Sequence, residues 1–102
     1  MILTIDIGNT NISLTIFSEN KIVKNQTLNT DVIKKSSDSN KILKKYFISK
    51  FTISGVIISS VVPELDEIFK FNIQKSLSIS PVFVSDLKAK LRIPTLIKNK
   101  KE

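Results

Sequence analysis

The chain has 102 residues, enough for one small domain, and its 41% hydrophobic and 25% charged residues are typical of a soluble globular protein. It contains no cysteine and no histidine, which excludes disulfide frameworks, Cys/His zinc sites and nucleophiles that need a histidine base. The net charge is +7, but residues 88–102 hold six basic residues and one acidic residue, so most of the excess belongs to the carboxyl-terminal segment.

The first third of the chain predicts three strands. Residues 1–7 are apolar at nearly every position except Asp6, a pattern typical of a central strand that is covered on both faces. Residues 11–18 alternate between apolar and polar side chains, which predicts a half-buried strand, and residues 22–28 predict a third. Because the connections are short, we expect an antiparallel meander.

The remainder alternates helices with strands. Residues 30–40 are polar and predict a loop that leads into a helix beginning near Asp38. Residues 55–62 are rich in β-branched side chains and predict a buried strand, parallel and adjacent to the first. Pro63 opens a second helix, and residues 81–85 predict a fifth strand. The apolar stripe of the second helix consists of Leu65, Ile68, Phe69, Ile73 and Leu77.

Two units are expected along the chain. Residues 1–86 have the order β-β-β-α-β-α-β, which is typical of the α/β, ribonuclease H-like half-domain of the actin and sugar-kinase superfamily. Residues 87–102 predict a basic segment, an edge strand with a disordered end, whose lysines either bind anions or simply face solvent. No stretch is long and apolar enough to span a membrane, and no signal peptide is predicted, so we expect a cytoplasmic protein.

The most informative motif lies between the first two predicted strands, at residues 6–11. A turn containing Gly8 lets backbone N–H groups approach an anion without a Cβ in the way, and Asn9, Thr10 and Asn11 add neutral donors. Asp6 repels bare phosphate, so it predicts Mg²⁺ between its carboxylate and a nucleotide. The alternative is a polar hairpin turn without a ligand, because Asn and Gly are common turn residues.

A second candidate is the serine pair Ser59 and Ser60, which ends the strand at residues 55–62. Ligands collect at the carboxyl ends of parallel strands, so this pair is expected near Asp6. The alternative is a strand end whose hydroxyl groups only cap the backbone.

Residues 5–11 and 55–63 together resemble the type III pantothenate kinase family, as do the pair Thr30 and Asp31 and residues 82–84. The resemblance implies a cytoplasmic homodimer that phosphorylates pantothenate with ATP, the first step of coenzyme A synthesis, using Mg²⁺ and a monovalent cation, K⁺ or NH₄⁺. It also implies that Asp6 holds Mg²⁺ together with ATP. The implied ATP-phosphate residues are Asp6, Ile7, Gly8, Asn9, Thr10, Asn11, Ile12 and Ser13, with Ser59 and Ser60 as further contacts.

The resemblance also places parts of the family's machinery after Glu102. These are the Gly-Ala-Asp-Arg motif with its catalytic aspartate, the monovalent-cation site, the second half-domain, and most of the pantothenate site and dimer interface. No catalytic residue is therefore predicted within the chain, and the chain alone is expected to be inactive. Thr27 stands where the family often carries arginine.

Three other functions were compared with a kinase. A Bvg accessory factor-like regulator would bind nucleic acid through the basic segment, but no recognition helix or interleaved aromatic residues accompany the lysines. A ribonuclease H-like nuclease needs several carboxylates at strand ends, where the sequence offers Asp6 alone. An inert fragment, with no biochemical activity of its own, is the third alternative.

Overall fold

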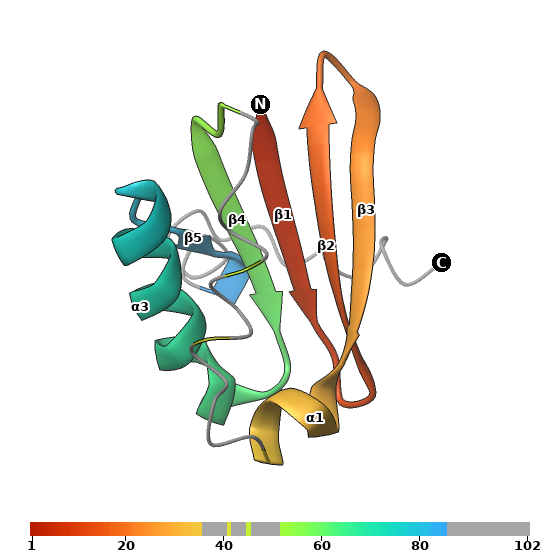
Figure 1. Ribbon diagram of the computed structural model, residues 1–102, viewed down its shortest axis with the longest axis vertical. Helices are drawn as coiled ribbons and strands as arrows, with labels where there is room; N and C mark the ends of the chain where they lie inside the picture. Colours follow the sequence, from red (N-terminus) through yellow and green to blue (C-terminus); the bar gives the residue numbers. More distant parts are fainter. Residues whose placement is uncertain (36–40, 42–44, 46–51, 86–102) are drawn as a thin grey trace.

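The computed structural model describes residues 1–35, 41, 45 and 52–85 (Figure 1). These residues form a mixed five-stranded sheet with the order β3-β2-β1-β4-β5, together with helices, so the fold is α/β as predicted. The strands are β1 (Ile2–Ile7), β2 (Asn11–Ser18), β3 (Lys21–Asn29), β4 (Gly55–Ser60) and β5 (Val82–Phe83). The helical elements are α1 (Thr30–Lys35), the 3₁₀ turn η1 (Pro63–Leu65) and α3 (Asp66–Leu77).

The predicted meander is confirmed, since β1 pairs with β2 and β2 with β3, both in antiparallel fashion. Glu19 and Asn20, between β2 and β3, both have positive φ values, 50° and 68°, as in hairpin turns that match the strand twist. The predicted position of β4 is also confirmed: it runs parallel to β1 and next to it, with Ile5 opposite Ile58. This arrangement brings the carboxyl ends of β1 and β4 together at one end of the sheet.

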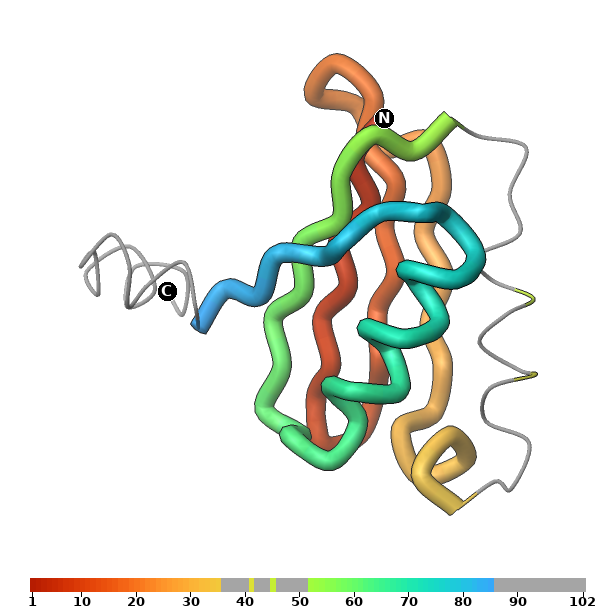
Figure 2. The backbone as a smooth tube through the Cα atoms, turned by 90° about the vertical axis from the view of Figure 1, so that its left-hand side faces the viewer, coloured from red at the N-terminus to blue at the C-terminus, as the bar shows by residue number. Residues whose placement is uncertain are grey.

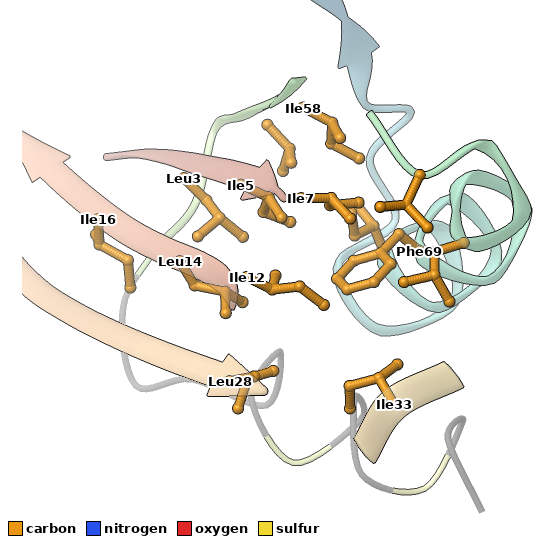
Figure 3. Packing of buried hydrophobic residues seen from close by; sticks show 14 residues of the cluster. Leu3, Ile5, Ile7, Ile12, Leu14, Ile16, Leu28, Ile33, Ile58 and Phe69 are labelled. Atoms are coloured by element: carbon orange, nitrogen blue, oxygen red, sulfur yellow. The ribbon is translucent and has the colours of Figure 1, made fainter. Parts of the chain in front are cut away.

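One face of the sheet carries the hydrophobic core, and α1 and α3 both lie against this face (Figure 2). Alternate residues of β1 and β2, such as Ile5, Ile7 and Ile12, point into it, and Phe69 of α3 and Ile33 of α1 fill the space opposite (Figure 3). The buried apolar residues are Leu3, Ile5, Ile7, Ile12, Leu14, Ile16, Leu28, Ile33, Val56, Ile58, Val62, Leu65, Phe69 and Ile73.

None of the described elements covers the opposite face of the sheet. Ile2 and Ile57 are 37% and 39% exposed there, and Asp6 is exposed as well. In the described part of the chain, β1 therefore differs from the expected strand that is covered on both faces. The reason is its alternation: positions 3, 5 and 7 are all apolar, whereas positions 2, 4 and 6 are isoleucine, threonine and aspartate.

The loop predicted for residues 30–40 is wrong at its start, because residues 30–35 form α1. The side-chain Oδ1 of Asn29 accepts a hydrogen bond from the N–H of Val32 at 3.1 Å, which caps the first turn of this helix. Ile33 then anchors the helix to the core with 1% exposure. The helix predicted to begin near Asp38 lies outside the described residues, except for Lys41 and Lys45, which are helical and exposed.

The second predicted helix is confirmed as η1 followed by α3, and Leu65, Phe69 and Ile73 are its buried apolar residues. Its other two predicted stripe residues, Ile68 and Leu77, pack partly buried against the core. The fifth strand is shorter than the predicted residues 81–85: β5 pairs with β4 through two residues only, and positions 84 and 85 are already helical.

The basic segment predicted at residues 87–102 lies outside the described part of the chain. Among the residues that the structure describes, no helix is long and apolar enough to cross a membrane.

Candidate functional site

The turn between β1 and β2 (residues 8–10) stands at the carboxyl end of β1 and closes tightly. The backbone N–H of Gly8 donates to the carbonyl oxygen of Asn11 at 2.9 Å. A Cβ atom on Gly8 would lie 3.0 Å from that same oxygen, closer than real Cβ atoms normally come. Glycine is therefore favoured here, since any other residue would force the two backbone segments apart by a few tenths of an ångström. Asn9 and Thr10 are exposed at the tip of the turn.

Thr30, the first residue of α1, holds both ends of this turn. Its hydroxyl Oγ1 donates to the carbonyl oxygen of Gly8 at 2.8 Å. Its backbone N–H donates to the carbonyl oxygen of Thr10 at 2.9 Å. The residue is fully buried, with 0% exposure, so the donor side of both hydrogen bonds lies in the protein interior. The sequence singled out Thr30 only through a resemblance, because a contact 22 residues away leaves no local pattern.

Asp6 lies in the middle of a row of polar side chains on the open face of the sheet. It is directly opposite Ser13 on β2 and Ser59 on β4, and Ser13 is opposite Thr27 on β3. Residues that are opposite in register point to the same face of a sheet, so these four side chains are neighbours. We call them the Asp6 row: Thr27, Ser13, Asp6 and Ser59. The expected closeness of Ser59 to Asp6 is thereby confirmed.

Ser60 has a different position from its neighbour Ser59. It is opposite Ile7 and therefore points to the same face as the core. Its Oγ accepts a hydrogen bond from the N–H of Val62 at 3.1 Å, which stabilises the bend between β4 and η1. The structure thus brings Ser59, and not Ser60, beside Asp6.

Ile7 and Ile12 flank the turn but are fully buried in the core, each with 0% exposure. Their side chains hold the ends of β1 and β2 in place, so only their backbone groups face the turn. Asn11, in contrast, is exposed, and Ser13 is half-buried within the Asp6 row. Of the eight residues proposed from the sequence, Ile7 and Ile12 therefore have a structural role, and the other six lie in or around the turn.

The oxygen atoms around Asp6 suit a magnesium ion that is bound partly by the protein and partly by the phosphate groups of a ligand. Among the described residues, no three acidic, histidine or cysteine side chains come together as a metal site. Mg²⁺ commonly uses one or two protein carboxylates and takes its other oxygens from water and from phosphate groups. A single exposed carboxylate flanked by the hydroxyl groups of Ser13 and Ser59 suits that role.

An ion pair joins α1 to η1 at the same end of the sheet (Figure 1). Nζ of Lys34 lies 3.2 Å from Oε2 of Glu64. The pKa of Glu64 is lowered from its ordinary value, first by a hydrogen bond from its own backbone N–H and then by the nearby Lys34 ammonium group. The sequence offered no sign of this pair, because α1 itself was not predicted.

Glu64→Gln should cause a small loss of stability at pH 7 that disappears in acid. The pKa of Glu64 is lowered in the folded chain, so its carboxylate stabilises the fold above its ordinary pKa, and this contribution is lost as the pH falls through the lowered value. Both side chains are largely exposed, which keeps the effect small. Urea midpoints of both chains at pH 7 and about pH 3 test this; a difference that grows in acid would contradict it.

Comparison with known proteins gives a consistent result for the whole chain. A family model described as type III pantothenate kinase matches residues 2–102. The type III pantothenate kinase of Dictyoglomus turgidum is 40% identical over 106 residues, covering 100% of this chain and 41% of that protein. Those of Finegoldia magna and Borrelia garinii subsp. bavariensis are 34% and 36% identical, over 98% and 81% of the chain but only 38% and 31% of their own lengths. The chain thus spans about a third to two fifths of the length of these relatives.

Solved structures that resemble the chain include two structures of Ppx/GppA proteins from Aquifex aeolicus. One is the type II variant of the phosphatase, with 14% identity and a TM-score of 0.49, covering 80% of this chain and 34% of that protein. The other is a further structure of the family member, with 18% identity, a TM-score of 0.47 and the same coverage. Sequence identities and TM-scores this low are not evidence of a shared function.

Proposed function

The chain belongs to the type III pantothenate kinase family, and from this membership we propose that it supplies the ATP-phosphate-binding part of an enzyme that phosphorylates pantothenate. The product would be 4'-phosphopantothenate, the first intermediate on the way to coenzyme A. The sheet and its helices would be the ribonuclease H-like half-domain of the actin and sugar-kinase superfamily. The observation that carries this proposal is the tightly closed turn at residues 8–10, placed beside Asp6.

In this proposal the turn receives the phosphate groups of ATP. Asn9 and Thr10 are exposed, so their side chains can donate to phosphate oxygens, and the absence of a Cβ at Gly8 lets the turn close tightly. The turn is held by hydrogen bonds before any ligand arrives, and a preorganised site loses less entropy on binding. Asn11 and Ser13 would border the same phosphate groups from β2.

Asp6 would hold the magnesium ion that accompanies ATP. Mg²⁺ neutralises charge on the phosphate groups and orients them for transfer. The carboxylate is exposed and has Ser13 and Ser59 as neighbours, whose hydroxyl groups can bond to water on the ion. Without the ion, Asp6 would repel the phosphate groups.

We further propose that the chain by itself binds ATP without transferring phosphate to pantothenate. The resemblance places the catalytic aspartate, the monovalent-cation site for K⁺ or NH₄⁺ and most of the pantothenate site after Glu102. The homodimer and the cytoplasmic location are likewise proposed from the family. A nuclease is disfavoured, because no three carboxylates come together among the described residues, and a regulator is not favoured by the relatives, which are kinases by name.

Binding of ATP to the 102-residue chain in the presence of Mg²⁺ tests this proposal. We expect saturable binding by calorimetry, with NMR shifts at Asn9, Thr10 and Asn11 and none at Phe71 on the outer side of α3. A coupled assay for ADP should show no turnover that depends on pantothenate. Absence of ATP binding, or shifts spread over lysine side chains that vanish with added salt, would contradict the proposal.

Asp6→Asn should weaken ATP binding about tenfold when Mg²⁺ is present and should change little when the ion is removed by EDTA, because the substitution removes one ligand charge at nearly constant shape. Glu19→Gln is the matched control, since it removes one negative charge from the exposed β2–β3 turn, at the opposite end of the sheet (Figure 1). Calorimetric titrations of the three chains measure this. If both variants weaken ATP binding equally, Asp6 acts only through the overall charge.

A further inference from the structure

The hydroxyl of the buried residue Thr30 donates a hydrogen bond to a backbone carbonyl group just after the end of β1. The carbonyl oxygen of Ile7, the last residue of that strand, accepts a hydrogen bond from the N–H of Val61 at 3.0 Å. The next carbonyl, that of Gly8, lies beyond the β1–β4 pairing, and the Thr30 hydroxyl satisfies it at 2.8 Å. Valine would fill nearly the same volume but would leave this carbonyl without that donor.

The direction of the Gly8 carbonyl also determines where a neighbouring donor points. In a planar trans peptide, the C=O of one residue and the N–H of the next point in opposite directions. Because the Gly8 carbonyl is held towards buried Thr30, the N–H of Asn9 points away from α1, at the exposed tip of the turn. Thr30 thereby determines the direction of the Asn9 N–H, although Thr30 itself is buried beneath the turn.

The backbone of Thr30 adds a second constraint on the same turn. Its N–H holds the Thr10 carbonyl at 2.9 Å, so a single residue fixes both the first and the last carbonyl of residues 8–10. The two bonds come from one rigid point, the junction of β3 and α1, which Ile33 anchors in the core. Rotation of the peptide planes of the turn would therefore break at least one of these two hydrogen bonds.

We propose that Thr30 is a positioning residue for anion binding, whose hydroxyl orients the Asn9 N–H towards a phosphate group of the nucleotide. This inference rests on the proposed function. It adds that Thr30 acts indirectly, through the turn, and that the backbone N–H of Asn9 contacts the phosphate group.

The test uses Thr30→Val, which removes the hydroxyl, and Thr30→Ser, which keeps it. We expect the dissociation constant for ATP with Mg²⁺ to rise about tenfold in Thr30→Val and to stay within about threefold of the original in Thr30→Ser. Without ligand, the NMR signal of the Asn9 amide should move in Thr30→Val and stay in place in Thr30→Ser. Should Thr30→Val be too unstable to measure, Thr30→Cys, with a much weaker donor of similar size, takes its place.

Ile73→Val is the control for stability, since it removes one methyl group from a residue that is 0% exposed on α3, a helix with no role in the proposed positioning of the turn. It should lower the melting temperature while leaving ATP affinity and the Asn9 signal unchanged. If Thr30→Val loses stability but binds ATP like the original chain, Thr30 is only structural and the inference is overturned. If the original chain does not bind ATP, the proposed function fails, and an unmoved Asn9 signal in Thr30→Val would separately show that the hydroxyl does not orient the turn.

Discussion

Replacing Phe69 by alanine should lower the free energy of unfolding of the chain by about 3–5 kcal/mol. Phe69 has 0% exposure and fills the space between α3 and the buried face of the sheet, opposite Ile7 and Ile12 (Figure 3). Its removal takes away a large apolar contact and leaves a cavity that the sheet, fixed by its ladder of hydrogen bonds, cannot close. Small domains are stable by about 5–15 kcal/mol, so little stability should remain.

Phe71→Ala is the matched control for this measurement, since it makes the same chemical change two residues further along α3. Phe71 is 53% exposed, and its ring lies 5.6 Å from Nζ of Lys75. Losing this exposed cation–π contact should cost no more than about 1 kcal/mol. Urea unfolding followed by circular dichroism gives both values. If the two variants lose equal stability, α3 does not pack on the sheet as the structure describes.

The strands and the core follow largely from local patterns. Alternation placed Ile12 and Leu14 on the buried face of β2, and helical spacing placed Phe69 and Ile73 on the buried side of α3. These predictions succeeded because burial repeats with the period of the element, which a short stretch of sequence records. The parallel pairing of β1 with β4 was expected from the predicted order of the elements, by analogy with known half-domains of this order.

The features that the sequence did not reveal depend on contacts between distant segments. Helix α1 rests on one cap from Asn29 and one anchor, Ile33, which is too little periodicity to detect in six residues. Ser59 and Ser60 point to opposite faces of β4. Which of them lies beside Asp6 could be decided only from the register of β4 with β1. The role of Thr30 depends on a carbonyl 22 residues earlier.

The candidate site combines these two kinds of information. Residue types marked the turn at residues 8–10 and Asp6, because glycine, amides and a carboxylate are recognisable wherever they stand. The fold then decided which neighbours they have: Ser13 and Ser59 beside Asp6, and Thr30 beneath the turn. The residues proposed to meet the phosphate groups were thus visible in the sequence, whereas the role proposed for Thr30 could be inferred only from its hydrogen bonds.

Gly8→Ala should weaken binding of ATP with Mg²⁺ at least about tenfold, because the added methyl group disturbs the whole turn rather than one side chain. The new Cβ would stand 3.0 Å from the carbonyl oxygen of Asn11, a backbone atom that also accepts the hydrogen bond from the Gly8 N–H at 2.9 Å. Relief of this contact requires the two strand ends to move apart, which lengthens that bond and displaces the peptide planes of the turn. Because the turn would present its backbone N–H groups to the phosphate groups, a displacement of a few tenths of an ångström weakens several hydrogen bonds at once.

Gly55→Ala is the matched control, because a Cβ there would meet only Cδ1 of Ile2, at 3.2 Å. That atom is the end of a flexible side chain on a residue that is 37% exposed, so it can turn aside at little cost. Both variants should remain folded by circular dichroism, and calorimetry should show lost ATP affinity for Gly8→Ala alone. Unchanged affinity in Gly8→Ala would mean that the nucleotide does not use this turn. Equal losses in both variants would mean instead that affinity follows the general stability of β1 and β4.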